Sequence, residues 1–254
     1  MSQFKLLTVG NPKIRKGTAF GYLTAVLHLA PGNLSGFQVC PKATEGCLAA
    51  CLNTAGRSGI TAGKGRLTTT EIASGTRTNA IQAARIRKTR AYFEDRPTFM
   101  AALAKDIAKL VTLATRHGLK PAIRLNGTSD IPWERVPVTA TIPNLMALFP
   151  TVQFYDYTKR ANRTGLPSNY VLTFSLAEGN DADAAKALDN GMNVAAVFRT
   201  VPEWFRFNNP VGMGRVERVI DGDQHDLRFL DPKGVIVGLY AKGNAKRDTS
   251  GFVR

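Results

Sequence analysis

Short apolar segments alternate with helical segments along most of this chain, and this alternation limits the fold more than any other feature of the sequence. After Gly118, each strand-like run of five to seven residues ends in a polar loop. Nearly continuous apolar runs of this length indicate strands that are buried on both faces, as in parallel sheets covered by helices. Strands are predicted at residues 22–30, 121–125, 152–157, 170–176, 193–199, 215–220 and 234–240.

Helices are expected between these strands, at residues 70–93, 97–117, 143–149 and 181–190. In the second of them, Phe99, Leu103, Ile107 and Leu110 recur at steps of three and four residues, which is the spacing of one helix face. We therefore expect a single α/β domain over residues 1–254. A partial or complete parallel (β/α) barrel is favoured over an open doubly wound sheet, and residues 53–97 form a possible basic insertion.

The chain is strongly basic. It has 34 Lys and Arg residues against 19 Asp and Glu residues, a formal net charge of +15. A positive field of this size attracts polyanions, so nucleic acid or a nucleotide is the expected partner. Cations in a glycine-rich segment and in the helix that follows are candidate phosphate contacts, although a solvated basic surface is the alternative. These candidates are Arg57, Lys64, Arg66, Arg85, Arg87 and Lys88.

The sequence contains no signal for a membrane or for secretion. No apolar run reaches the roughly 18 residues that a membrane span needs, and the N-terminal residues lack the pattern of a signal peptide. The three cysteines lie within residues 40–51, so a disulfide framework is not expected. These features predict a protein of the reducing cytoplasm with no membrane partner.

The cysteine segment CPKATEGCLAAC contains all the cysteines of the chain, Cys40, Cys47 and Cys51. The last two are four residues apart and would lie on one face of a helix, with Cys40 folding over them from the loop. This clustering predicts three ligands of one metal centre. An iron–sulfur cluster usually takes four thiolates, so three would leave one coordination position open. The alternatives are a zinc site, completed by His28, His117 or His225, and unligated thiols.

The position of the cysteine segment after the first predicted strand resembles the radical S-adenosylmethionine superfamily. The cluster loop of that superfamily follows the first strand of a partial (β/α)6 barrel. The spacing differs, because the superfamily usually has Cys-x3-Cys-x2-Cys, and Ala50 stands where an aromatic residue usually precedes the third cysteine. The resemblance implies a 4Fe–4S cluster held by the three cysteines, S-adenosylmethionine as cofactor, and an electron donor as partner.

A second resemblance covers most of the chain. The segments NLSGFQVCPKATEGCLAAC, RLNGTSDIPW, FYDYTKR, DGDQHDLR and GLYAKG are similar to the bacteriophage "gene product 88" family. This resemblance implies a phage origin, and hence the cytoplasm of an infected bacterium, but it does not imply a mechanism.

Polar side chains at the ends of three predicted strands are candidate contacts for the cofactor. In the superfamily, the end of the second strand binds the amino group of S-adenosylmethionine, although its Gly-Gly-Glu motif is absent here. Asx turns and solvated loops are the alternative for these positions. The candidates are Asn126, Ser129, Asp130, Lys159, Ser175 and Glu178.

The segment 221–226 is also rich in groups that can bind metal. Asp221, Asp223, His225 and Asp226 could hold Mg²⁺ or Mn²⁺ for phosphodiester cleavage. A polar hairpin turn at Asp221-Gly222 is favoured over this metal site.

The sequence thus predicts an iron–sulfur enzyme that resembles radical S-adenosylmethionine enzymes and acts on a nucleotide or nucleic acid. A non-enzymatic zinc-containing nucleic-acid-binding protein and a metal-dependent nuclease are the alternatives.

Overall fold

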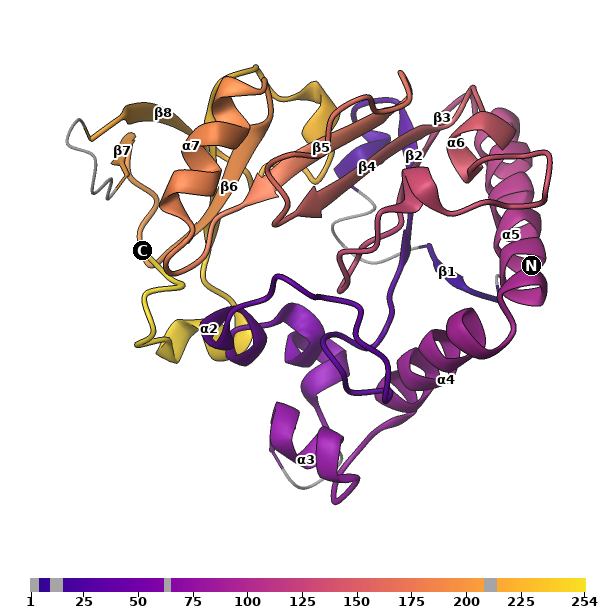
Figure 1. Cartoon of the computed structure of the whole chain (residues 1–254), viewed down its shortest axis with the longest axis horizontal. Coiled ribbons are helices and arrows are strands. Elements are labelled where there is room, and N and C mark those ends of the chain that lie inside the picture. Colours follow the sequence, from indigo (N-terminus) through magenta and orange to yellow (C-terminus); the bar gives the residue numbers. More distant parts are fainter. Residues whose placement is uncertain (1–4, 10–15, 62–64, 208–213) are drawn as a thin grey trace.

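The structure, a computed structural model, describes residues 5–9, 16–61, 65–207 and 214–254. Its centre is a nine-stranded sheet with the order β1-β2-β3-β4-β5-β6-β9-β8-β7, and this sheet is not closed (Figure 1). The strands are β1 (Leu7–Thr8), β2 (Tyr22–Leu27), β3 (Lys120–Arg124), β4 (Gln153–Thr158), β5 (Tyr170–Ser175), β6 (Asn193–Phe198), β7 (Trp204–Arg206), β8 (Val216–Asp221) and β9 (Ile236–Tyr240).

All seven predicted strands are present, and all seven run parallel. They are β2 to β6, β9 and β8. The two remaining strands, β1 and β7, pair antiparallel at the two ends of the sheet. The sequence did not predict these two because they have only two and three residues. The prediction of a mostly parallel α/β domain is confirmed.

The predicted helix at 70–93 is wrong, because this region contains two helices. α3 (Thr69–Ser74) ends at Gly75, whose φ of 72° lies in the left-handed region that favours glycine. α4 (Ala80–Glu94) begins after Asn79, whose side chain accepts a hydrogen bond from the Gln82 N–H. The other helices agree with the prediction to within two residues at each end. They are α5 (Arg96–Arg116), α6 (Leu145–Leu148) and α7 (Asp181–Asp189).

The sheet has two different faces because side chains alternate along each strand. One face carries Ile123, Phe154 and Phe174, which pack in the main core with the apolar faces of α5 and α7. The other face, called the inner face here, carries Tyr22, Ala122, Tyr155 and Val171 at its amino-terminal end.

The connection between β8 and β9 crosses this inner face. Its Leu227 and Phe229, at the short 3-10 helix η4 (Arg228–Leu230), pack against Tyr155. They form a floor beneath the strand ends. The predicted hairpin at Asp221-Gly222 is therefore wrong, since β8 and β9 are parallel neighbours and cannot be joined by a tight turn.

Among the described residues, no helix is long and apolar enough to cross a membrane.

Candidate metal centre

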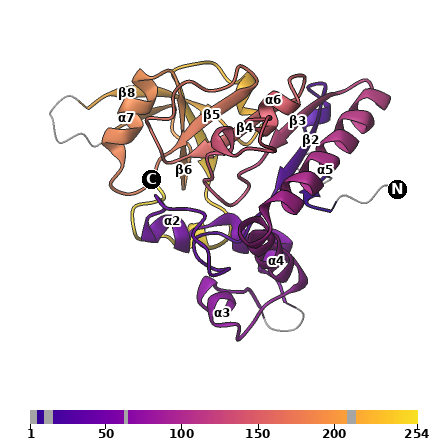
Figure 2. The same ribbon diagram turned by 45° about the vertical axis from the view of Figure 1, so that its right-hand side comes forward.

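A cavity of about 210 Å³ opens at the carboxyl ends of the parallel strands. Its walls come from the inner face of the sheet, from the cysteine segment and from the C-terminal segment 241–254. In both views of the ribbon, α2 (Glu45–Ala49) lies below the strands with the C-terminal segment beside it (Figures 1 and 2). Cys40, Cys47 and Cys51 all line this cavity.

Local hydrogen bonds fix the shape of the cysteine segment. Thr44 caps α2, because its hydroxyl accepts a hydrogen bond of 3.2 Å from the Cys47 N–H. Cys51 begins the 3-10 helix η1 (Leu52–Thr54), and its sulfur accepts a hydrogen bond of 3.5 Å from the Asn53 N–H. The Cys40 thiol donates to the carbonyl oxygen of Thr128 at 3.7 Å. Cys40 approaches from the loop and Cys47 belongs to a helix, as predicted, but α2 ends at Ala49 and Cys51 begins η1, so the two cysteines do not share one helix as expected.

Buried side chains of α4 hold η1 in place through hydrogen bonds. Arg85 donates to the carbonyl oxygen of Asn53 at 2.9 Å, and Gln82 donates to the same oxygen at 2.8 Å. On the other side, the 3-10 helix η5 (Gly243–Arg247) is joined to η1 by a hydrogen bond of 3.1 Å from Asn244 to the Thr54 hydroxyl. The cysteine segment is thus clamped between α4 and the C-terminal segment.

The electrostatic environment of the thiols has two opposing parts. Burial raises the pKa of Cys40 to about 12 and that of Cys51 to about 11, and it also raises the pKa of Cys47. Two cations act in the opposite direction: Lys159 lowers the pKa of Cys47, and Arg85 and Lys159 lower that of Cys51. Since only a thiolate binds metal, ligation at neutral pH would release protons from these groups.

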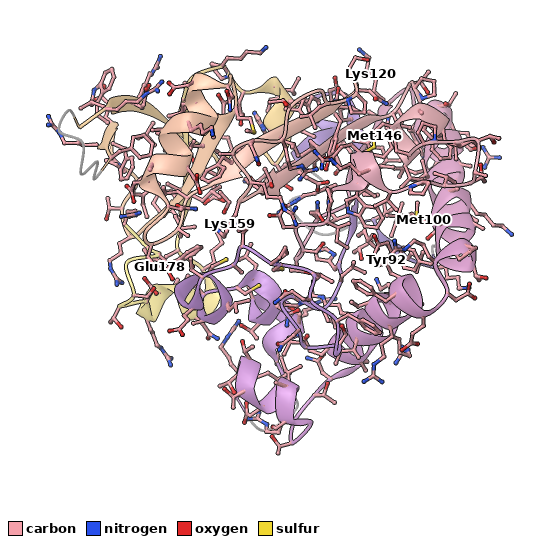
Figure 3. The ribbon with its side chains drawn as sticks, viewed as in Figure 1. Tyr92, Met100, Lys120, Met146, Lys159 and Glu178 are labelled. Carbon is pink, nitrogen blue, oxygen red and sulfur yellow. The ribbon has the colours of Figure 1, made fainter. Side chains whose placement is uncertain are left out.

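Lys159 and Glu178 lie between the strands and α2 (Figure 3). The Lys159 ammonium group, at the end of β4, is hydrogen-bonded to Ser175 at the end of β5. A carboxylate oxygen of Glu178 accepts a hydrogen bond of 2.7 Å from the Gly46 N–H in α2. A Cβ added to Gly46 would lie 2.0 Å from the Ser250 hydroxyl, so only glycine permits this close approach.

Five of the six predicted cofactor contacts line the cavity: Asn126, Ser129, Asp130, Lys159 and Ser175. The Asn126 side chain is used internally, because its oxygen accepts hydrogen bonds from Ser129, Ile131 and Trp133.

Asp130 accepts a hydrogen bond from the Lys159 N–H, and its other carboxylate oxygen is buried without a hydrogen bond, 3.5 Å from Arg163. The sixth contact, Glu178, reaches α2 beside the cavity and has one buried oxygen without a hydrogen bond. Cofactor binding by the six residues stays a prediction.

The predicted phosphate contacts divide into two groups. Arg85 bonds to Asn53, Lys88 bonds to the carbonyl oxygen of Leu6, and Arg66 bonds to the carbonyl oxygen of Thr54, so these three stabilise the fold. Arg57 and Arg87 are exposed. Lys64 lies outside the described residues. Nucleic-acid binding at these positions stays a prediction.

The three histidines proposed as a fourth zinc ligand have different surroundings. His28 is mostly buried, and burial together with Arg85, Arg124 and Lys88 lowers its pKa to about 3. His225 packs against the Phe20 ring, and His117 is the C-cap residue of α5.

The acidic groups of segment 221–226 bond to different partners: Asp223 pairs with Lys242, and Asp226 lies 3.5 Å from Arg124. In the part of the chain that the structure describes, no group of three or more His, Cys, Asp or Glu side chains is positioned to hold a metal ion. The iron–sulfur, zinc and nuclease interpretations stay predictions.

Several residues that line the cavity were not singled out from the sequence. Arg124 projects from the inner face of the sheet, and Lys242 and Phe252 come from the C-terminal segment. The Arg124 position carried a signal, because an arginine inside the apolar run PAIRL has to face either solvent or a polar cavity.

The three thiols fit an iron–sulfur cluster in donor type and in surrounding charge. Soft thiolates are the ligands of iron–sulfur clusters, and cations beside them offset the negative charge that the ligands carry. Lys159 and Arg85 provide such cations. The cavity that adjoins the sulfur atoms leaves space for further ligands.

The chain was compared with family models, with curated proteins and with solved structures. No curated protein and no solved structure matches it. The model of one family, described as "Gene product 88", matches residues 5–254, which is nearly the whole chain. The chain therefore belongs to the gene product 88 family, which is consistent with the bacteriophage origin expected from its sequence segments.

Proposed function

We propose that this chain is an iron–sulfur protein that resembles radical S-adenosylmethionine enzymes and acts on a nucleotide or nucleic acid in the cytoplasm of a phage-infected bacterium. Cys40, Cys47 and Cys51 would hold a 4Fe–4S cluster with one open coordination position. The observation that carries this proposal is that all three cysteines of the chain line one cavity at the carboxyl ends of parallel strands, where the loops of parallel α/β folds place their chemistry.

The strand order supports a partial barrel as the scaffold. From β2 to β6 the strands are neighbours in the order in which they occur along the chain, as in a (β/α) barrel, and β9 follows β6. A doubly wound sheet reverses its order at a switch point near the middle. Here the reversal occurs only at β9 and β8, near one end.

When bound, the cluster would supply the electron that cleaves S-adenosylmethionine reductively and starts radical chemistry on the substrate. The residues of the chain would bind and orient the cofactor. Glu178 has a buried carboxylate oxygen without a hydrogen bond, suited to an N–H donor of the cofactor. Asp130 lies at the cavity wall, with its second carboxylate oxygen 3.5 Å from Arg163. Ser129 and Ser175 have hydroxyl groups at the cavity wall, suited to the ribose or the carboxylate. An external electron donor is required.

The experiment that tests this proposal is anaerobic purification followed by iron and acid-labile sulfide analysis. About four iron and four sulfide per chain, with absorption near 400 nm, are expected for the wild-type chain, and much less for the Cys40→Ser, Cys47→Ser and Cys51→Ser variants. Stoichiometric zinc without sulfide would overturn the proposal and support the zinc alternative. Metal-dependent nucleic-acid cleavage that is lost in the Asp223→Ala and Asp226→Ala variants but kept in the cysteine variants would support the nuclease alternative.

A further inference from the structure

The cavity has a second set of polar groups away from the cysteines. Arg124 and Asp226 both line it, and each side chain is only 15% exposed. Arg124 projects from the end of β3, and Asp226 comes from the connection that crosses the inner face of the sheet. Two segments more than 100 residues apart in sequence thus bring a cation and an anion together on the cavity wall.

The Arg124 guanidinium group has too few partners for a buried cation. Its contact with Asp226 is long, at 3.5 Å, and it is the only hydrogen bond that this group makes to the described residues. The Nε of Arg124 is buried without a hydrogen bond. A guanidinium group has five N–H donors, so most of them are available to a ligand in the cavity.

Asp226 provides hydrogen-bond acceptors beside the donors of Arg124. Its carboxylate can accept about four hydrogen bonds, and the long contact with Arg124 is its one side-chain hydrogen bond to the described residues. Donors on Arg124 and acceptors on Asp226 therefore lie side by side. A ligand that satisfies both must present an acceptor and an N–H or O–H donor on neighbouring atoms.

The walls of the cavity are largely apolar, and an aromatic ring lies beside this pair. The Arg124 guanidinium carbon lies 4.4 Å from the centre of the Tyr157 ring. Val197, Leu239 and Tyr240 also line the cavity. The whole cavity, which extends to the cysteines, has a volume of about 210 Å³, and an apolar cavity of about 150 Å³ holds benzene. A planar heterocycle would therefore fill most of the cavity, and the cofactor and the remainder of a larger ligand would lie toward and outside its mouth.

Charge argues against a phosphate group at this end. Two of the cations that line the cavity, Arg124 and Lys242, are each paired with a carboxylate, Asp226 and Asp223. A doubly charged phosphate would have to displace or approach both carboxylates. An uncharged ring with adjacent acceptors and donors meets no such repulsion.

We propose that this end of the cavity binds the nucleobase of the substrate, with Arg124 donating to a ring nitrogen or carbonyl oxygen and Asp226 accepting from a neighbouring N–H group. Arginine and aspartate side chains recognise base edges in this way in protein–nucleic acid complexes. The inference rests on the proposed function, because it specifies which part of a nucleotide enters the cavity. The sugar and phosphate then face the mouth.

The test is calorimetric titration of the full-length chain with the four ribonucleosides, and separately with ribose 5-phosphate and inorganic phosphate. At least one nucleoside should bind about tenfold or more tightly than ribose 5-phosphate. The Asp226→Asn variant should weaken nucleoside binding by about tenfold, whereas the Asp183→Asn variant on the exposed face of α7 should not change it. Because a single change at Arg124 leaves Asp226 unpaired, the double variant Arg124→Gln/Asp226→Asn removes both charges together, and it should also lose nucleoside binding.

Ribose 5-phosphate or phosphate binding as tightly as the nucleosides would overturn the inference, and so would a failure of all four nucleosides to bind. Iron analysis of the same samples separates this result from the proposed function. Protein that contains a cluster but does not bind nucleosides contradicts only the nucleobase inference. Nucleoside binding by protein that contains no iron contradicts only the proposed function.

Discussion

The Lys159 ammonium group donates to both oxygen atoms of Ser175, to the carbonyl oxygen at 3.1 Å and to the hydroxyl at 3.0 Å. These bonds join the ends of β4 and β5, and they hold a cation beside Cys47. Lys159 is 9% exposed, so its charge acts on the cysteine site with little screening by water.

The first prediction concerns this cation. Lys159→Met keeps an unbranched side chain of nearly the same length and removes its charge, so the reduced, more negative state of a bound cluster loses stabilisation. The midpoint potential measured by a redox titration followed by paramagnetic resonance should become more negative. Lys186→Met, on an exposed position of α7, is the matched control and should leave the potential unchanged. A more positive potential in Lys159→Met would contradict the assignment.

The second prediction concerns the contact of α2 with the strand ends. Gly46→Ala would place a methyl group 2.0 Å from the Ser250 hydroxyl and 2.6 Å from the Glu178 carboxylate, so α2 would have to move away. The free energy of unfolding should fall by about 1–3 kcal/mol, as for other overpacked sites. Iron content per chain should also fall. Glu45→Ala, at the exposed neighbouring position, should leave iron content unchanged; equal iron in Gly46→Ala would contradict the role of this contact.

A third prediction concerns Asn126 and distinguishes a structural role of its side chain from a role in cofactor binding. Its side-chain oxygen accepts hydrogen bonds of 2.8 Å from Ser129, 3.0 Å from the Ile131 N–H and 3.1 Å from the Trp133 indole. Asn126→Ala leaves these donors without an acceptor and should lower the free energy of unfolding by about 3 kcal/mol. Ser129→Ala should lower it by less than about 1 kcal/mol, since its hydroxyl lies at the cavity wall. Chemical denaturation measures both, and a stable Asn126→Ala variant would contradict the structural role.

The fourth prediction is a pH dependence. Burial raises the pKa of Asp156 to about 7, against about 3.9 in an unfolded chain. Between these values the folded state binds more protons than the unfolded state, so this group lowers stability as the pH rises from about 4 to 7. His28 has the opposite effect, because its pKa falls from 6.5 to about 3 on folding.

The Asp156→Asn variant isolates the aspartate because His28 is present in both proteins. Stability of the variant relative to the wild type should increase between pH 4 and 7, by at most about 1.4 kcal/mol per pH unit, and then level off. Urea denaturation at several pH values measures this difference. A difference that is constant or that decreases with pH would contradict the burial of a neutral Asp156.

The parallel strands could be predicted because their apolar runs are continuous and their ends are marked by polar loops. Gly75 and Asn79 show the limit for helices: both are ordinary end signals, but an isolated glycine is also tolerated inside a helix, and the sequence predicts one helix over 70–93. The path of the connection between β8 and β9 across the inner face had no signal in the sequence. It depends on the packing of Leu227 and Phe229 against Tyr155, which is distant from them in the sequence.

The cysteine site was predictable only where its residues are close together in sequence or lie at the ends of predicted strands. Three cysteines within residues 40–51 predict one site on their own, and Lys159 is predicted from its position at a strand end. The C-terminal wall of the cavity, with Lys242 and Phe252, could not be inferred, because only tertiary packing brings these residues to α2.

The most direct test of the open cluster position is the paramagnetic resonance spectrum of anaerobically reduced protein, recorded without and with S-adenosylmethionine. Cofactor bound at an open iron should change the g values of the reduced cluster, and the change should be absent with methylthioadenosine, which lacks the amino acid part of S-adenosylmethionine. A spectrum that is the same with and without S-adenosylmethionine, or reduced protein with no cluster signal, would contradict the account.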